Sequence, residues 1–339
     1  MDIDMTITSD TELGAYLRER KVDLALARLV ESIAASAIVV ADHLKEAAFQ
    51  NQIGSAGTTN VQGEDQKLLD VLADRVFRET CAEATSLAAH VSEEAEDVTW
   101  LKPPSAGDLI LYLDPLDGSS NLEVNLSVGS IFAVSQVLAD GDSNVLRKGR
   151  DFLCAGYAIY GPSTMLVMTY GVEVVGFTLD PSDGQFKLTN ARMRVPQETN
   201  EFAVNSSRQR FWDEPIRRYV DECLEGAAGP RGKDFNMRWT ASMVADVHRI
   251  LTRGGVFLYP ADDSNRRAGG KLRLMYEANP MAFLIEAAGG AASTGTEDIL
   301  RIQPQAHHQR VSVLLGSSNE IERLVQFHQI HHSQEEIGS

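Results

Sequence analysis

Residues 114–121, with the sequence Asp-Pro-Leu-Asp-Gly-Ser-Ser-Asn, constrain this chain more than any other segment. They follow the apolar run 109–113, which predicts a buried strand, so two carboxylates leave the strand at its carboxyl end. The proline fixes its own φ and biases Asp114 toward an extended backbone, while Gly118 permits close approach to a ligand and a serine can cap a following helix. Carboxylates suit Mg²⁺, and amides at a helix start suit phosphate. The segment therefore predicts metal-assisted phosphate chemistry, although by itself it is also compatible with an ordinary turn.

Composition narrows the classes of protein. The chain has 339 residues, 43% of them hydrophobic, enough for two domains that share a substantial core. No uninterrupted apolar run approaches the roughly 20 residues of a membrane-spanning helix, and the acidic start of the chain is unlike a secretory signal. A formal charge of −17 argues against nucleic acid or anionic membrane as a partner. The three dispersed cysteines are typical of reduced thiols, so we expect a cytoplasmic protein.

Periodicity predicts a layered α/β protein. The first half predicts helices over 24–44 and 66–81, a mobile glycine-rich loop over 52–63 between them, and a mostly antiparallel meander. The strands of this meander are expected at 109–113, 131–138, 156–160, 165–169, 172–179 and 186–188. The second half alternates helix and strand, with elements expected at 215–224, 241–252, 256–259, 280–288 and 311–315. Polar residues at 196–201 suggest a boundary, so we expect domains 1–198 and 199–339.

Further acids are candidates to join the first two. Glu93 and Glu94 follow a short apolar segment, where neighbouring side chains of a strand point opposite ways. Glu64 lies on the glycine-rich loop, Asp70 in the helix behind it, and Glu277 just before an Asn-Pro pair that predicts an asparagine-capped helix. Each acid taken singly is more typical of a solvated surface charge.

Cationic and polar candidates lie in the second half. Lys271 follows a Gly-Gly pair that favours close approach to a ligand, whereas Arg266 and Arg267 are typical of a solvated loop. Asn205 and Tyr259 each stand at the end of an expected strand, where ligands of open α/β sheets gather. Arg238 precedes an expected helix. The histidines near the carboxyl terminus lie in a polar tail and are assigned no role.

Seven ordered blocks resemble class I fructose-1,6-bisphosphatase, of the lithium-sensitive sugar and inositol phosphatase superfamily. They span 60–70, 91–94, 114–121, 155–161, 242–249, 255–260 and 270–283, and the match runs from about residue 23 to 325. The resemblance implies an αβαβα sandwich of two sub-domains, a homotetramer, and Mg²⁺-dependent removal of the 1-phosphate of fructose 1,6-bisphosphate. It leaves open whether the protein serves gluconeogenesis or the Calvin cycle.

The resemblance also implies residue roles. Two or three Mg²⁺ ions, for which Mn²⁺ is a possible substitute, would be held by Glu93, Asp114, the carbonyl of Leu116, Asp117, Glu277 and, when its loop closes, Glu64. Asp70 and Glu94 would orient or deprotonate water beside Glu93. The reacting phosphate would be bound by Asp117, Gly118, Ser119 and Ser120, and the sugar by Lys271 and the backbone near Met243. The second phosphate would be bound by Asn205, Tyr259 and Arg238, the last from a neighbouring subunit, and Lys271 is counted with this set.

Some positions depart from the family pattern. Arg208 and Trp239 stand where the second-phosphate site usually has tyrosines, so Arg208 is expected to add a cation. A dual fructose-1,6-/sedoheptulose-1,7-bisphosphatase is therefore an alternative. Residues 24–27 and the pair Asp108-Leu109 stand where inhibited members have the segments that bind AMP, which predicts AMP insensitivity. The absence of a cysteine-bearing insertion argues against thioredoxin control. Other readings are an inositol monophosphatase-like enzyme and an inactive sugar-phosphate sensor.

Overall fold

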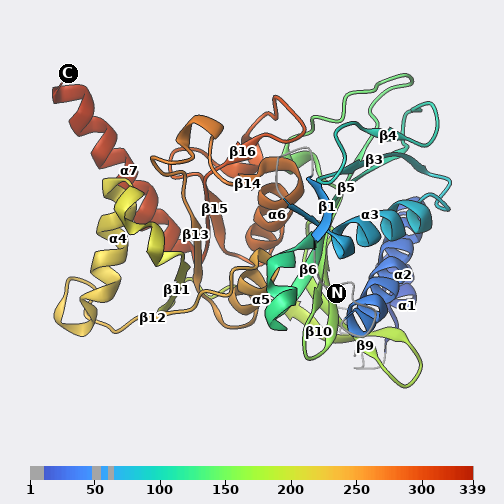
Figure 1. Cartoon of the computed structure of the whole chain (residues 1–339), viewed down its shortest axis with the longest axis horizontal. Coiled ribbons are helices and arrows are strands. Elements are labelled where there is room, and N and C mark those ends of the chain that lie inside the picture. The colour runs from blue at the N-terminus through green and yellow to red at the C-terminus, as the bar shows by residue number, and fades with distance from the viewer. Residues whose placement is uncertain (1–10, 48–54, 60–64, 339) are drawn as a thin grey trace, which may run out of the picture. The chain divides into compact units, whose positions relative to one another are not determined.

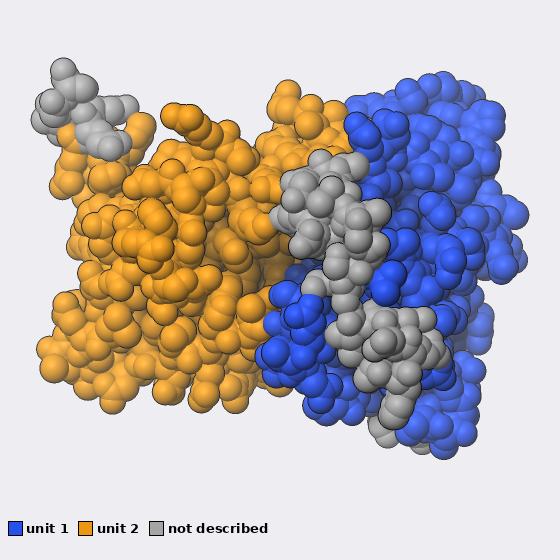
Figure 2. All heavy atoms as spheres, in the orientation of Figure 1, with its two compact units in different colours: residues 1–145, 153–193 blue, residues 146–152, 194–339 orange. Residues whose placement is uncertain are grey.

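The computed structural model describes residues 11–47, 55–59 and 65–338. Its contacts divide the chain into two compact units, coloured separately in Figure 2. Unit 1 comprises residues 1–145 and 153–193, and unit 2 comprises residues 146–152 and 194–339. Both units combine helices with sheets, so the predicted α/β class is confirmed (Figure 1).

Unit 1 is built on an eight-stranded sheet with the order β10-β9-β8-β7-β6-β5-β3-β4. The strands are β3 (Leu87–Ser92), β4 (Thr99–Trp100), β5 (Leu109–Asp117), β6 (Val128–Gln136), β7 (Cys154–Tyr160), β8 (Thr164–Thr169), β9 (Val174–Asp180) and β10 (Gln185–Met193). From β5 to β10 each strand pairs antiparallel with the next, which confirms the predicted meander. β3 and β5 are parallel, so their carboxyl ends lie at the same edge.

Three helices accompany this sheet: α1 (Leu13–Glu19), α2 (Leu24–Glu46) and α3 (Leu68–Cys81). Asp23 caps α2, and an apolar stripe that includes Leu26, Leu29, Val30 and Ile33 is buried in the core of unit 1. By length and composition alone α2 could cross a membrane, which the search for uninterrupted apolar runs did not detect. In the structure α2 packs against α3, β7 and β8. Part of the expected loop is ordered as β1 (Ser55–Thr59), paired antiparallel with β2 (Asp65–Lys67).

Unit 2 contains a five-stranded sheet with the order β12-β11-β13-β17-β15. Its strands are β11 (Glu201–Val204), β12 (Asn236–Met237), β13 (Val256–Tyr259), β15 (Ala291–Ser293) and β17 (Val313–Gly316), and β14 (Leu272–Arg273) pairs separately with β16 (Arg310–Val311). Its α-helices are α4 (Glu214–Leu224), α5 (Met243–Arg253), α6 (Asn279–Ala287) and α7 (Ser318–Gly338). Trp212, Tyr219 and Phe327 pack with the apolar faces of β11, β13 and β17 in its core.

Two expectations for unit 2 were wrong. The polar tail is helical as α7, where the buried face of Leu324 and Phe327 contributes to the core and His328 Nδ1 lies 2.8 Å from the Leu324 carbonyl oxygen. Asn279 does not cap α6, because residues Leu274–Ala278 form a π-helical turn that runs directly into that helix. Asn279 itself has helical angles (φ −64°, ψ −48°), whereas a capping residue needs an extended backbone.

Glu286 on α6 gives unit 2 a pH-dependent stability. Burial, together with the charge of Asp298, raises the pKa of Glu286 from 4.5 to about 7, although Arg150 Nη2 lies 3.6 Å away. The folded state holds this proton more tightly than the unfolded state, so stability is lost as pH rises from 4.5 through 7. Thermal melts should show Glu286→Gln about 2–4 °C above wild type at pH 8 and level with it at pH 4, below the unfolded pKa of 4.5. The exposed control Glu297→Gln should show no such pH-dependent gap, and a gap that stays constant from pH 4 to 8 would contradict the prediction.

Candidate active site

A bulge in β5 brings Asp114 and Asp117 together. Asp114 pairs with Ile131 of β6 and Asp117 pairs with Gly129. The two paired positions are therefore three residues apart on β5 but only two residues apart on β6. Residues three apart on a regular strand point to opposite faces, but the extra residue of the bulge returns both carboxylates to one side. Their oxygens come within 4.8 Å of each other, and the residues are only 4% and 8% exposed.

The chain supports this bulge locally. Pro115 has no N–H to leave unpaired there, and its carbonyl accepts a hydrogen bond of 2.7 Å from Ser130 Oγ. The Leu116 amide donates to Asp114 Oδ1 at 3.1 Å. Two buried carboxylates this close repel each other unless a cation lies with them. The donor set therefore fits a hard divalent cation such as Mg²⁺.

Gly118 turns the chain after the second carboxylate. Its φ of 74° lies in the left-handed region, where glycine is favoured, and it occupies the position before the short 3₁₀ helix Ser119–Val124. That position has no side-chain cap, so the expectation that Ser119 or Ser120 caps the helix was wrong. Ser119 instead donates from Oγ to Asp70 Oδ2 at 3.4 Å, while Ser120 is exposed.

The parallel pairing of β3 with β5 brings further acids to the same edge of the sheet. Ser92 pairs with Leu113, and the Glu93 amide donates to the Leu113 carbonyl at 2.9 Å. Glu93 is buried and Glu94 is half-buried in the turn that follows. Asp70, buried in the first turn of α3, approaches this edge through its hydrogen bond with Ser119. The acids that the sequence motifs of unit 1 single out therefore lie, as far as the structure describes them, near the same edge of the sheet.

Two further metal-ligand candidates were named from the sequence. Glu64 is outside the described residues. Glu277 belongs to unit 2, where it is buried and its Oε2 accepts a hydrogen bond of 2.6 Å from the Arg273 amide. The buried guanidinium of Arg273 is 3.8 Å from the same oxygen and partly balances its charge. Sequence reasoning did not single out Arg273, although its (i, i+4) spacing from Glu277 was visible.

The second-phosphate candidates of unit 2 also meet at a sheet edge. β11 and β13 are parallel, with Val204 opposite Leu258, so Asn205 and Tyr259 each follow the same pair of residues. Asn205 Oδ1 accepts from the Ser207 amide at 3.2 Å, so the carbonyl side of the amide group is engaged within the chain. Trp239 stacks on Phe257 with ring centroids 5.9 Å apart and lies 5.8 Å from the ring of Tyr259. The indole of Trp239 thus fills the space beside the Tyr259 ring.

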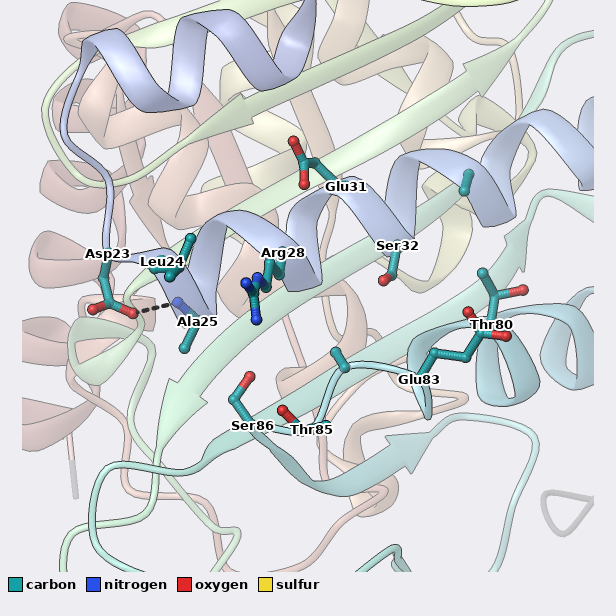
Figure 3. Close-up of a pocket in the computed structure, with 12 residues that line it drawn as sticks. Asp23, Leu24, Ala25, Arg28, Glu31, Ser32, Thr80, Glu83, Thr85 and Ser86 are labelled. Carbon is teal, nitrogen blue, oxygen red and sulfur yellow. Dashed lines mark hydrogen bonds between the residues drawn. The ribbon is translucent and has the colours of Figure 1, made fainter.

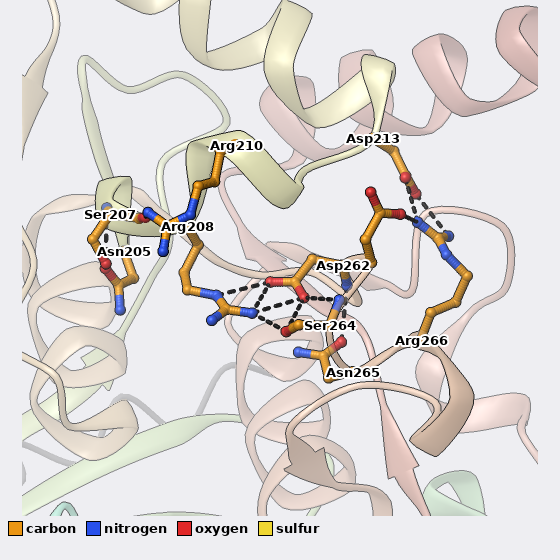
Figure 4. A network of polar contacts seen from close by, with 10 residues as sticks. Asn205, Ser207, Arg208, Arg210, Asp213, Asp262, Ser264, Asn265 and Arg266 are labelled. Atoms are coloured by element: carbon orange, nitrogen blue, oxygen red, sulfur yellow. Dashed lines mark hydrogen bonds and ion pairs between the residues drawn. The ribbon is translucent and has the colours of Figure 1, made fainter.

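Arg208, which the sequence suggested as an additional phosphate-binding cation, forms an ion pair with a carboxylate of its own unit. Its Nε and Nη2 donate to the carboxylate of Asp262, which is 2% exposed, at distances of 2.8–2.9 Å (Figure 4). Burial opposes ionisation of Asp262, but hydrogen bonds from Ser264 and Arg208 outweigh it and lower its pKa. The charge of Arg208 is therefore neutralised by Asp262, a partner too distant in sequence to be anticipated.

The other basic and sugar-binding candidates have separate positions. Arg238 is half-exposed, with Nε 3.7 Å from a carboxylate oxygen of Glu201. Met243 is buried at the start of α5, which Ser242 caps. Lys271 is half-buried after the two glycines. A close contact within the chain requires glycine at both positions, because a Cβ at Gly269 or Gly270 would lie 2.4–2.5 Å from a carbonyl oxygen of β16.

An α/β fold with paired buried carboxylates beside a glycine-led turn suits a phosphatase, a hydrolase of phosphate esters that uses metal ions. Family models support this class: "Fructose-1-6-bisphosphatase, N-terminal domain" matches residues 5–191 and "Fructose-1-6-bisphosphatase, C-terminal domain" matches residues 195–329. The chain therefore belongs to the fructose-1,6-bisphosphatase family.

Solved structures of fructose-1,6-bisphosphatase from Leishmania major are similar over most of the chain. The holo form is 34% identical with a TM-score of 0.89, covering 95% of this chain and 100% of the other. The apo form is 32% identical with a TM-score of 0.82, and the form described as T-state is 32% identical with a TM-score of 0.81. Each of these covers 94% of this chain and 99% of the other.

Proposed function

We propose that this protein hydrolyses the 1-phosphate of fructose 1,6-bisphosphate, with Mg²⁺, to fructose 6-phosphate and phosphate. The observation that carries the proposal is the β5 bulge, which places Asp114 and Asp117 side by side at the edge reached by Glu93 and Asp70. Family membership supplies the substrate class.

We propose that Asp114, Asp117 and Glu277 hold one metal ion, and that Glu93, Asp114 and the Leu116 carbonyl hold a second. Glu64 would contribute to a third. When bound, the ions would acidify the attacking water and stabilise the charge of the transferred phosphoryl group. Buried, preorganised carboxylates need little rearrangement to bind such ions, which supports Mg²⁺ and Mn²⁺ as candidates.

The chain's own groups would orient water and phosphate. Asp70 and Glu94 would accept the proton of the attacking water, and the hydrogen bond from Ser119 fixes one oxygen of Asp70 for this task. The amides after Gly118 would receive the reacting phosphate, because its left-handed backbone opens the start of the 3₁₀ helix. The side chains of Asp117, Ser119 and Ser120 would border that phosphate.

The other end of the sugar would bind to unit 2. Asn205, Tyr259 and Lys271 would hold the second phosphate and the sugar with the backbone near Met243, and Arg238 would serve a neighbouring subunit of a homotetramer. The partial exposure of Arg238 is compatible with that task. A sugar bisphosphate is favoured over inositol monophosphate because these residues provide a second anion site.

Sedoheptulose 1,7-bisphosphate is the second candidate substrate. Trp239 replaces a phenol hydroxyl, and Arg208 is occupied by Asp262, so fewer donors define the distance between the phosphates. Phosphate release from fructose 1,6-bisphosphate, sedoheptulose 1,7-bisphosphate and inositol phosphate, with and without Mg²⁺, tests both proposals. The proposed function requires Mg²⁺-dependent release of phosphate from fructose 1,6-bisphosphate. Comparable release from the second would establish dual activity, and no release from it would exclude that activity.

AMP is expected to leave the activity unchanged. The start of α2 lines a cavity of about 730 Å³ together with residues 80 and 83–86 (Figure 3). Asp23 caps this helix by accepting from the Ala25 and Leu26 amides at 2.9 and 3.2 Å, so its carboxylate occupies donors that an anion would need. Asp108 adds a second acid where inhibited members have a lysine. Steady-state rates with micromolar AMP test this prediction, and AMP inhibition of the wild-type protein would contradict it.

Control by a thiol–disulfide switch is not supported. Cys81, Cys154 and Cys223 are all buried, and burial raises the pKa of each thiol to about 12. Thiolates are the reactive species in disulfide exchange, so these cysteines should react slowly.

A further inference from the structure

One hydrogen bond connects helix α3 to the end of strand β3. Ser92 Oγ donates to Asp74 Oδ1 at 2.5 Å. Ser92 is the last residue of β3 and is buried, while Asp74 lies four residues after Asp70 on α3. Residues four apart lie on the same helical face, one turn from each other, so α3 presents both acids to the same side.

The same hydroxyl also accepts a hydrogen bond from the turn that holds Glu93 and Glu94. The Glu94 amide donates to Ser92 Oγ at 3.3 Å, and the Glu93 amide donates to the Leu113 carbonyl at 2.9 Å. A serine hydroxyl has one proton to donate, and a carboxylate only accepts, so the direction from Glu94 through Ser92 to Asp74 is determined. Asp74 therefore orients the Ser92 hydroxyl, whose oxygen accepts from the Glu94 amide.

The other charged and titratable groups near Asp74 do not take over this role. Arg78 Nη1 is 3.9 Å from Asp74 Oδ2, which is an ion pair without hydrogen-bond geometry. His90 precedes Ser92 by two residues on β3, and burial lowers its pKa to about 4, so it is neutral. Within the described part of the chain, His90 Nε2 has no hydrogen-bond partner.

We propose that Ser92 and Asp74 are a positioning pair that fixes the Glu93–Glu94 turn relative to α3, and thereby sets the spacing between Asp70 and the turn. The inference rests on the proposed function, in which Asp70 and Glu94 handle the water and Glu93 binds metal. Neither Ser92 nor Asp74 is proposed to touch the substrate. Their effect is on the geometry of the groups that do.

The test compares Ser92→Ala with Ser135→Ala. Ser135 is a matched control, since it is 1% exposed against 2% for Ser92 and its Oγ also makes a buried hydrogen bond, 2.9 Å long, to Tyr112 in the same sheet. Electron paramagnetic resonance titration with Mn²⁺ should show binding weakened by about 10–100-fold in Ser92→Ala and Asp74→Ala, as expected when a group supporting a metal ligand is removed. kcat should fall by a similar factor while KM changes less than about threefold. Ser135→Ala should lower the melting temperature alone.

Asp74→Asn separates hydrogen bonding from a general loss of stability. Its amide oxygen can still accept from Ser92, so Mn²⁺ binding and kcat should return to within about threefold of wild type. The proposal is overturned if Ser92→Ala matches Ser135→Ala in Mn²⁺ binding and kcat, or if Asp74→Asn is no better than Asp74→Ala. Failure of the wild type to release phosphate from fructose 1,6-bisphosphate would instead refute the proposed function, while the Mn²⁺ titrations would still decide the role of the pair.

Discussion

Asp117→Asn is expected to lower kcat for fructose 1,6-bisphosphate on the order of 10³-fold, equivalent to about 4 kcal/mol of transition-state stabilisation. The substitution keeps the size of the side chain but removes a charge from the carboxylate pair formed by the β5 bulge. It also relieves the repulsion between two buried acids, so the melting temperature without metal should stay level or rise. Phosphate release and thermal melts with and without Mg²⁺ provide the two readouts.

The matched control is Asp183→Asn, in the turn between β9 and β10. Asp183 is exposed, pairs with Lys187 at 2.7 Å, and lies in the same unit as Asp117 but far from it in sequence. Its replacement should leave kcat at the wild-type value. Activity of Asp117→Asn within tenfold of wild type would show that Asp117 does not bind the metal.

Lys271→Met should raise KM for fructose 1,6-bisphosphate by roughly 10–100-fold with little change in kcat. A hydrogen bond to a charged group contributes about 1.5–3 kcal/mol, and this one would bind the substrate equally in the ground and transition states. Fructose 1-phosphate lacks the second phosphate, so its hydrolysis should change much less. Comparing the two substrates separates recognition of the second phosphate from damage to the reaction centre.

Arg267→Met is the control for losing a positive charge nearby. Arg267 is exposed in the short turn Arg266–Ala268, four residues before Lys271. An equal rise of KM in both variants would indicate general electrostatic attraction by this basic segment. An equal loss of kcat on both substrates in Lys271→Met would assign the lysine to the reacting end instead.

Local sequence signals predicted most of the fold. The helix expected over 24–44 occurs as Leu24–Glu46, and the antiparallel meander appears in the predicted order. These elements have strong apolar periodicity and turn residues that agree with it, as at the Asp180–Gly184 turn. Predictions failed where tertiary packing overrode a local rule. α7 carries polar residues that predicted a tail, yet its buried face completes the core of unit 2.

The acidic residues of the site were found from sequence because they cluster in short motifs, but their pairwise geometry was not. Spacing alone leaves Asp114 and Asp117 on opposite faces of a strand, and only the registration of β5 against β6 shows the extra residue that unites them. Asp262 went unnoticed because its partner Arg208 is 54 residues away. Asp74 likewise required the packing of α3 against β3 to reveal its contact with Ser92.

The sequence by itself determined the α/β class, the family and the list of acids, because those depend on residue identity, periodicity and order along the chain. Only the tertiary structure decided that Arg208 is neutralised, that Ser119 serves Asp70 rather than a helix cap, and that Ser92 connects the Glu93–Glu94 turn to Asp74. Hydrogen bonds act over about 3 Å between groups that are distant in sequence, so their partners exist only once the strands are paired and the helices packed.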